Sequence, residues 1–200
     1  MGKYIIGVTG ASGSIYAMRL MEELLSLKQE VFLTITSSGI LVLEQELGLR
    51  LDGLSEAEVA KKILSYCKKD GLLNYYDEKH IGANIASGSF RTDGMIVVPC
   101  SMSTVSAIAH GSSSNLLERA ADVMIKERKK LVIVPRETPL STIHLRNLLS
   151  LSEQNVHIVP PMPGFYYHPQ KLDDIIDALV GRLLDYLDLE HNLLNRWEGM

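Results

Sequence analysis

Short apolar runs alternate with longer amphipathic stretches along this chain, which is the pattern of β-α units built around a parallel sheet. Five of the runs are rich in β-branched residues and are bounded by turn residues or charges, as buried parallel strands are. The sequence therefore predicts an α/β fold with an open parallel sheet. The five predicted strands are Tyr4–Val8, Val31–Thr36, Met95–Val98, Leu131–Val134 and Val156–Val159.

Two amphipathic stretches carry apolar residues at helical spacing, one from Ala17 to Leu25 and one from Leu172 to Leu187. We expect both to be helices that cover the sheet. The segment 51–90 is less regular and holds one predicted helix near Ser55–Tyr66. Because no repeat, low-complexity tract or linker interrupts the pattern, residues 1–200 are expected to form a single domain.

The composition is that of an ordinary globular domain, with 46% hydrophobic residues in a chain of 200 and a net charge of −4. Its Lys and Arg residues are interspersed with Asp and Glu, which disfavours a nucleic acid or an anionic membrane as the partner. The two cysteines form no disulfide framework, and no cluster of Cys, His and carboxylates has metal-ligand spacing. For that reason we expect a protein that needs no metal. No signal-length apolar stretch is present, so we also expect the protein to be cytoplasmic.

Hydroxyl groups and glycines dominate the loops that follow the first four predicted strands. In an open α/β sheet such loops meet beyond the carboxyl ends of the strands, where ligands bind near the point at which the strand order reverses. Backbone N–H groups, hydroxyls and helix N-termini suit a phosphate there. The plainer interpretation is that these residues only make turns and helix caps. Four such loops at one edge favour a site; they are residues 9–13, 36–39, 99–104 and 135–138.

The first of these loops, within GVTGASG at residues 7–13, fits neither common phosphate-binding pattern. A P-loop would require a lysine after Gly13, and a dinucleotide fingerprint would require an acidic residue where the run 36–38 has Thr, Ser and Ser. An ATPase and an NAD enzyme are therefore poor fits. A mononucleotide such as FMN fits better, since hydroxyl-rich loops can hold its phosphate and ribityl chain without an acidic clamp on a ribose.

The second half of the chain carries cations that suit an anion. Arg119 and Lys126 lie seven positions apart on one face of a predicted helix, and Arg136 follows the fourth strand, so these three are expected to converge. Arg182 stands at the border of an apolar helix face. Each cation alone is more simply a solvated surface charge. The aromatic loop PGFYYHP at 163–169 could add a tyrosine phenol to a second phosphate site.

Four segments carry motifs that occur together in one protein family: GVTGASG, SGSFRTDGMIVVPCSMSTVSAIAHG, LLERAADVMIKERKKLVIVPRETPLSTIHLRNLLSLS and PPMPGFYYHPQKLDDIID. Within them ERAADV, KER, RETPL and FY follow one another at the spacing of that family. Over nearly its whole length the chain resembles the UbiX family of flavin prenyltransferases. The resemblance implies a three-layer, doubly wound parallel sheet of the flavodoxin-like or Rossmann-like kind, forming a single flavin-binding prenyltransferase domain.

The resemblance also implies an activity. The protein would attach to N5 and C6 of reduced FMN a dimethylallyl group taken from dimethylallyl monophosphate, without a metal, although a pyrophosphate donor stays open. The product would be prenylated FMN, the cofactor of UbiD-type decarboxylases, and the protein would be a homo-oligomer, typically a dodecamer. An FMN-dependent decarboxylase of small carboxylates and a non-catalytic FMN carrier are the alternatives. The former would need a catalytic His after the first helices and an Asn-rich motif, which the sequence does not show.

Site residues are implied position by position. Flavin-binding positions are matched by Gly10, Ala11, Ser12, Thr36, Ser101, Met102, Ser103, Thr104 and Arg136, and the prenyl-phosphate site by Tyr166 and Arg182. Arg119, Lys126 and Glu137 match residues around the phosphate and flavin, and Glu46 matches an acid near the reacting centre. The expected catalytic residues are thus Ser12, Glu46, Arg119, Lys126, Glu137, Tyr166 and Arg182.

Ring closure needs a base for the C6 proton, and the released phosphate, Glu46, Glu137 and a relay through the Ser12 hydroxyl are all candidates. The plainer interpretations are that Glu46 is an exposed helix charge and that Glu137 is an acid in the first turn of a helix.

Two positions depart from the family pattern. Ser103 stands where many members have Lys, which removes a cation near the flavin, whereas Thr36 stands where many have Ser and keeps the hydroxyl. The tail from about 188 to 200, with Trp197, is expected to pack on a neighbouring subunit; a disordered tail is the alternative.

Overall fold

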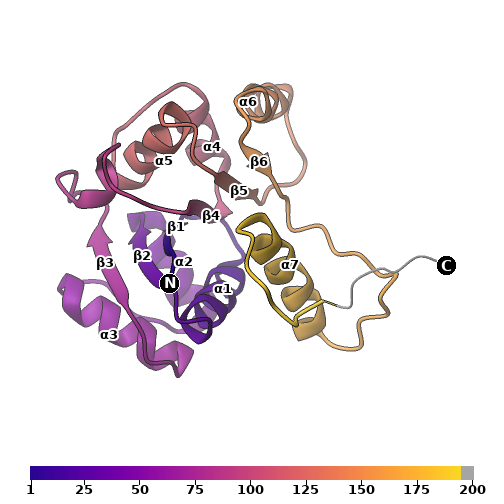
Figure 1. Cartoon of the computed structure of the whole chain (residues 1–200). Helices are drawn as coiled ribbons and strands as arrows, with labels where there is room; N and C mark the ends of the chain where they lie inside the picture. The colour runs from indigo at the N-terminus through magenta and orange to yellow at the C-terminus, as the bar shows by residue number, and fades with distance from the viewer. Residues whose placement is uncertain (195–200) are drawn as a thin grey trace.

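The computed structural model describes residues 1–194 and forms one six-stranded sheet in which neighbouring strands are parallel (Figure 1). The strand order is β3-β2-β1-β4-β5-β6, so it reverses between β1 and β4, as in doubly wound nucleotide-binding sheets. The predicted fold class is confirmed. The strands are β1 (Lys3–Val8), β2 (Glu30–Ile35), β3 (Leu73–Asp77), β4 (Gly94–Cys100), β5 (Leu131–Pro135) and β6 (His157–Ile158).

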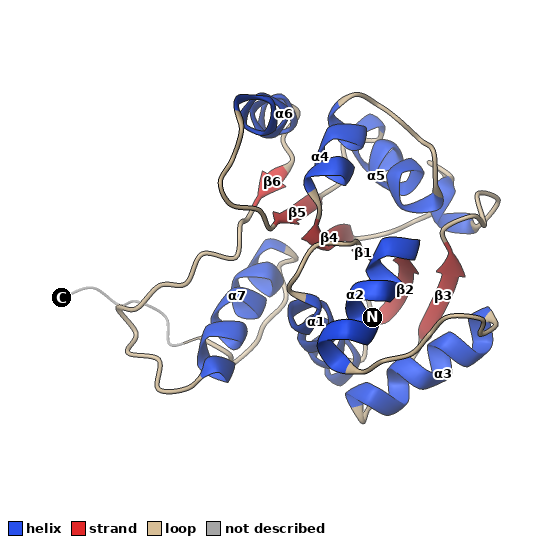
Figure 2. Ribbon diagram, turned by 180° about the vertical axis from the view of Figure 1, so that it is seen from behind, coloured by secondary structure: helices blue, strands red, loops and turns tan. Residues whose placement is uncertain are grey.

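Helices cover both faces of the sheet (Figures 1 and 2). On one face lie α1 (Ser14–Ser26), α2 (Ser37–Leu47), α3 (Glu56–Cys67) and α7 (Leu172–Tyr186). On the other lie α4 (Met102–Ala109), α5 (Leu116–Lys126), α6 (Thr142–Glu153) and the 3-10 turn η1 (Asn84–Ala86). Within the described part of the chain, no helix combines the length and apolar character needed to cross a bilayer.

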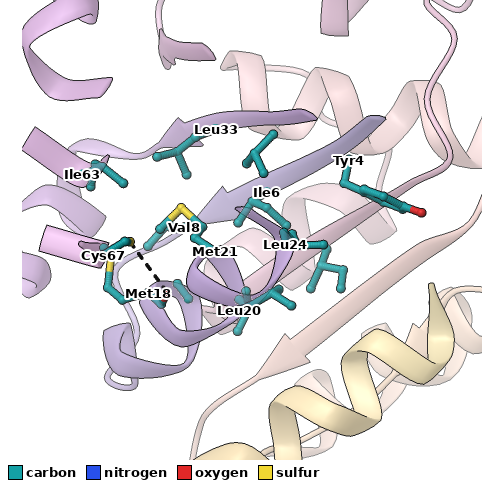
Figure 3. Close-up of a cluster of buried hydrophobic side chains, with 14 of the residues drawn as sticks. Tyr4, Ile6, Val8, Met18, Leu20, Met21, Leu24, Leu33, Ile63 and Cys67 are labelled. Carbon is teal, nitrogen blue, oxygen red and sulfur yellow. Dashed lines mark hydrogen bonds between the residues drawn. The ribbon is translucent and has the colours of Figure 1, made fainter. Parts of the chain in front are cut away.

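Side chains along β1 alternate between the two layers. Ile6 and Val8 point to one face, where they pack with Met21 and Leu24 of α1 (Figure 3). Ile5 points to the other face and packs in the layer of α4, α5 and α6. Because both faces are covered, the central strands appear in the sequence as continuous apolar runs, and this is why their positions could be predicted.

The structure differs from the predicted strands at the edges of the sheet. The edge strand β3 is absent from the predicted set because its sequence, LNYYD, has only Tyr75 buried and carries no apolar run. The last strand is shorter than predicted and spans two residues, His157–Ile158. The second strand ends at Ile35, and Thr36 instead caps the N-terminus of α2.

Candidate active site

The loops after β1 and β4 meet where the strand order reverses, and Thr9 joins them. Its hydroxyl donates to the Pro99 carbonyl oxygen at 2.8 Å and accepts from the Ser101 backbone N–H at 2.7 Å. Thr9 is buried, so water does not compete for these bonds. The two loops are thereby fixed as one unit at the edge of the sheet where a doubly wound fold binds its ligand.

A hydroxyl-lined cavity of about 250 Å³, here called the cradle, opens at this edge. Ser101 caps α4, and its hydroxyl oxygen lies 2.9 Å from Ser103 Oγ and 3.0 Å from Thr104 Oγ1. Thr36 caps α2 by accepting from the Gly39 N–H. Such hydroxyls, with helix N-terminal N–H groups behind them, suit a phosphate or a ribityl chain. The cradle is lined by Gly10, Thr36, Ser37, Ser38, Glu78, Ser101, Ser103, Thr104, Asn115 and Glu118.

Gly10 lies where the loop after β1 touches the first turn of α2. A Cβ atom on Gly10 would lie 2.4 Å from Ser38 Cβ, so any larger residue would push the loop and the helix apart. Two other predicted flavin-binding residues, Ala11 and Met102, have buried side chains. Gly10, Ala11 and Met102 would therefore contact a ligand mainly through their backbone atoms.

Glu46 on α2 reaches back to the loop after β1. Its carboxylate accepts from the backbone N–H groups of Gly13 at 3.1 Å and Ser14 at 2.8 Å, which supplies the cap that α1 lacks from its own N-cap side chain. Burial raises the pKa of Glu46, but hydrogen bonds from the Ser12 hydroxyl and from these N–H groups outweigh it and hold the pKa below its ordinary value. Glu46 is thus more than an exposed helix charge, and it contacts Ser12.

Two more carboxylates occupy helix N-termini around the cradle. Glu78, directly after β3, accepts from the Ser37 N–H at 3.0 Å, and Glu118 accepts from the Ser114 N–H at 2.9 Å just before α5. The N-terminus of α4 is capped by the Ser101 hydroxyl, and no carboxylate of residues 1–194 bonds to it. Because a carboxylate repels a phosphate, α4 offers the N-terminus at this edge that best suits an anion.

Arg136, at the end of β5, turns towards the same loop. Its Nε donates to the Ser12 carbonyl oxygen at 3.3 Å, and the side chain is half-buried. Glu137 is exposed, and its carboxylate accepts from the Thr138 N–H of its own loop at 2.9 Å. Since α6 begins only at Thr142, the interpretation of Glu137 as an acid in the first turn of a helix is wrong.

A second cavity, of about 620 Å³, lies between α7 and the extended segment that joins β6 to α7; we call it the aromatic pocket. Figures 1 and 2 show this segment running away from the sheet before it returns to α7. Tyr166 of the segment and Arg182 of α7 both line the pocket, so the structure brings them together. The Arg182 guanidinium lies 5.8 Å from the centroid of the Tyr186 ring. Arg182 forms no ion pair within residues 1–194.

Arg119 and Lys126 do not lie at the aromatic pocket of their own chain, and their convergence with Arg136 stays a prediction. Both are exposed on α5, which packs in the layer of α4 and α6, whereas the aromatic pocket lies beside α7 on the opposite face of the sheet. Seven residues of helix also separate the two cations by roughly 10 Å along the axis. Lys126 pairs with its neighbour Glu127 at 3.3 Å. Helical spacing predicted a shared face correctly but could not predict which layer that face would join.

The sequence-based site omitted several residues that line the cradle: Ser37, Ser38, Glu78, Asn115 and Glu118. The two serines stand in a predicted strand-end loop and could have been included on that ground. Glu78 follows the edge strand that the apolar pattern missed, and Glu118 is buried on a helix and reaches the site only through the packing of α5. Across the described residues, no group of three or more His, Cys, Asp or Glu is arranged to hold a metal ion.

Comparison with known proteins identifies the family. The flavoprotein family model matches residues 2–184. The flavin prenyltransferase UbiX of Halalkalibacterium halodurans is 48% identical over 198 residues, which cover 98% of this chain and 93% of that relative. This chain belongs to the UbiX family of flavin prenyltransferases. The resemblance expected from the sequence motifs is therefore confirmed, and the chain is a transferase enzyme of this family.

Solved structures agree with this assignment. The crystal structure of AnUbiX (PadA1) in complex with FMN and dimethylallyl pyrophosphate superposes with a TM-score of 0.86 at 37% identity, covering 100% of this chain and 98% of that one. A protein of Escherichia coli O157:H7, described as a dodecameric FMN-dependent UbiX-like decarboxylase, gives a TM-score of 0.85 at 43% identity, covering 98% and 100%. The UbiX fold thus extends over the part of the chain that the structure describes.

Proposed function

We propose that this chain transfers a dimethylallyl group from dimethylallyl monophosphate to N5 and C6 of reduced FMN, and that the prenylated FMN is passed to a UbiD-type decarboxylase. One observation carries the proposal: the chain has two cavities of different chemistry, and the same stretch of chain contributes Gly10 to the cradle and Tyr16 to the aromatic pocket. The cradle offers hydroxyls and a helix N-terminus that binds no carboxylate of residues 1–194, and the aromatic pocket offers Arg182, which has no ion pair within those residues, beside apolar walls. A carrier of FMN alone would have no use for the second cavity.

FMN fits the cradle through its phosphate and ribityl chain. The phosphate is best held at the N-terminus of α4, by the hydroxyls of Ser101, Ser103 and Thr104, because the neighbouring helix N-termini already bind carboxylates. Gly10 and Thr36 line the same cradle, and Arg136 is bonded to the adjoining loop at Ser12. When bound in reduced form, FMN supplies the nucleophilic atoms N5 and C6.

Tyr166 and Arg182 would bind the phosphate of the prenyl donor. The bond between the allylic carbon and the ester oxygen breaks as the carbon bonds to N5, and the electron pair leaves with the phosphate. A guanidinium and a phenol would stabilise the negative charge that accumulates there. The apolar side chains of the pocket, among them Ile175 and Leu179, keep water from the allylic carbon.

Closing the second bond needs a proton added to the double bond of the attached prenyl group, so that its tertiary carbon can bond to C6, and it then releases the proton of C6. Glu46 is the side chain best suited to accept it, because its lowered pKa keeps it ionised near neutral pH and because the Ser12 hydroxyl bonded to it can pass the proton. Glu137 is less suited, since the one hydrogen bond described for its carboxylate lies within its own loop. The released phosphate is the remaining acceptor, and a Glu46→Gln variant that keeps full turnover would favour it.

We also propose that the protein is a homododecamer and that Arg119 and Lys126 act on the prenyl phosphate of a neighbouring copy. Support comes from their distance from the aromatic pocket of their own chain and from α6, whose Ile143, Leu145 and Leu149 side chains are more than half exposed. Co-expressed Arg119→Ala and Arg182→Ala chains should then recover activity that neither has alone, since some mixed sites hold both arginines. No recovery would refute the shared site. Trp197, which we expected to pack on a neighbour, lies outside the described residues.

A cytoplasmic location and a single domain over residues 1–200 complete the proposal. Both cysteines, Cys67 and Cys100, are free thiols buried in the core, which suits a reducing compartment.

The decisive test is anaerobic incubation of the purified protein with reduced FMN and dimethylallyl monophosphate, followed by mass analysis of the flavin released. We expect a mass gain of one prenyl unit, and no gain with Tyr166→Phe combined with Arg182→Ala. A parallel reaction with the pyrophosphate donor separates the two donors. Unchanged FMN with both donors, while it stays bound and reduced, would refute the transferase. Release of carbon dioxide from small carboxylates would then favour the decarboxylase alternative, and flavin binding alone the carrier.

A further inference from the structure

Tyr16 lines the aromatic pocket and lies six residues after Gly10, which lines the cradle. It stands in the first turn of α1, directly after the loop that carries Gly10 and Ser12, yet its side chain lines the aromatic pocket together with Tyr166 and Arg182. Its backbone N–H donates to the Gly13 carbonyl oxygen at 3.0 Å, which anchors the residue to the flavin-binding loop. Among the residues that line the aromatic pocket, Tyr16 is therefore the one closest in sequence to the loop that carries Gly10.

The backbone leaves room for the Tyr16 ring at this position. Gly13 has a φ of +116°, a conformation that favours glycine. A Cβ atom there would also lie only 3.1 Å from Tyr16 Cδ2 and 3.3 Å from Cε2. The glycine thus serves two purposes, because it permits the turn and lets the ring pack against the loop. The ring is fixed at the start of α1 and is not a mobile surface group.

The phenol of Tyr16 makes no hydrogen bond within residues 1–194, although the side chain is half-buried. Burial raises its pKa, so the group stays neutral at physiological pH. A neutral ring with a free hydroxyl beside the cation Arg182 suits an apolar chain that ends in a phosphate, with the ring against the chain and the guanidinium on the anion.

The volume of the aromatic pocket also indicates that a single wall residue selects the prenyl donor. The aromatic pocket has a volume of about 620 Å³, which is in the range of sites for drug-sized ligands and exceeds what a five-carbon chain fills. The pocket as a whole therefore does not select a short donor. Any selection must come from a wall close to the reacting atoms, and Tyr16 is the wall residue attached to the flavin-binding loop.

We propose that the Tyr16 ring is a specificity-determining residue, which limits the length of the prenyl chain and directs its allylic carbon towards the flavin. This inference rests on the proposed function, because it concerns the donor of that reaction. It assigns to Tyr16 a contact with the apolar part of the donor, distinct from the phosphate contacts of Tyr166 and Arg182.

The test compares dimethylallyl monophosphate with the ten-carbon geranyl monophosphate as donors for the wild type, Tyr16→Leu and Tyr16→Phe, with product mass and kcat/KM as readouts. The wild type should prefer the five-carbon donor, and Tyr16→Leu should reduce that preference about tenfold, the effect of a changed apolar contact in a pocket. Tyr16→Phe keeps the ring and should keep the preference. Tyr66→Leu, the same change on α3 away from both cavities, is the matched control.

Binding of FMN to each variant separates the possible failures. If Tyr16→Leu binds FMN as the wild type does and keeps its donor preference, the inference is wrong. If the variant loses FMN affinity in proportion to its loss of turnover, the ring supports the flavin-binding loop and the inference is again wrong. A wild type that yields no prenylated FMN from either donor refutes the proposed function itself, which is a different result from both.

Discussion

The cradle and the aromatic pocket are built in different ways. The cradle lies at the reversal point of the sheet, where buried Thr9 ties two loops together and short hydroxyl contacts fix the start of α4. The aromatic pocket is closed on one side by an extended segment whose side chains at Met162, Phe165 and Tyr166 are largely exposed. The cradle is thus held by hydrogen bonds between its loops, whereas the exposed apolar and aromatic side chains of the segment have no cover among residues 1–194. The two should therefore respond separately to substitution.

Arg182→Ala is expected to give the largest difference between the effect on the prenyl donor and the effect on FMN binding. Loss of the cation at a leaving phosphate should lower kcat/KM for the prenyl donor by roughly 10²–10³-fold, because the charge then develops without a partner. FMN affinity, measured by quenching of flavin fluorescence, should stay unchanged. Arg91→Ala removes another exposed arginine and serves as the control. A parallel loss of FMN affinity would show that the two regions are one unit.

Gly10→Ala should damage the cradle and leave the aromatic pocket intact. Its Cβ would lie 2.4 Å from Ser38 Cβ, and relief of that overlap should cost about 1–3 kcal/mol in the free energy of unfolding and weaken FMN binding. Urea denaturation and a flavin titration measure the two effects. Gly82→Ala is the control, since nothing lies within 4 Å of a Cβ at that position. Equal behaviour of the two variants would contradict the packing described for Gly10.

Glu46→Gln tests the link between the cradle loop and α2. The pKa of Glu46 is lower in the folded protein than its ordinary value of 4.5, so its stabilising effect is complete above 4.5 and is lost as the pH falls through the lower, folded pKa. At pH 7 we expect a loss of about 1 kcal/mol in the free energy of unfolding, and no difference from wild type in strong acid. Glu44→Gln affects a surface pair with Arg50 and should leave the free energy of unfolding unchanged both at pH 7 and in strong acid. A difference that persists in strong acid would mean that the charge is not the cause.

The smallest effect is expected from Asp177→Asn, which removes an ion pair between α7 and α1. Arg19 Nε lies 2.7 Å from Asp177 Oδ1, and both side chains are partly buried. Asp177→Asn should lower the free energy of unfolding by less than about 1 kcal/mol and raise KM for the prenyl donor more than it changes kcat, because α7 carries Arg182. Asp173→Asn, which breaks an exposed pair with Lys171, is the control. An unchanged KM in both would show that this ion pair does not position the pocket.

The cradle and the aromatic pocket also differ in how far the sequence predicts them. Gly10, Thr36, Ser101 and Arg136 stand at strand ends, and parallel strands bring such residues to one edge whatever covers the sheet. The cradle could therefore be located from the apolar pattern together with the Gly and Ser content of the loops. Glu118 could not, because only the packing of α5 turns its carboxylate to the same edge.

The sequence by itself determined the central strands, the parallel sheet and the identity of the family, because these depend on local periodicity and on motifs that are contiguous in the chain. Only the tertiary structure decided that Glu46 caps α1, that Arg119 and Arg182 lie on opposite faces of the sheet, and that Tyr16 lines the pocket beside Arg182. The physical reason is that helical spacing sets which residues share a face, while the layer that the face meets depends on crossovers and on contacts between residues far apart in the chain.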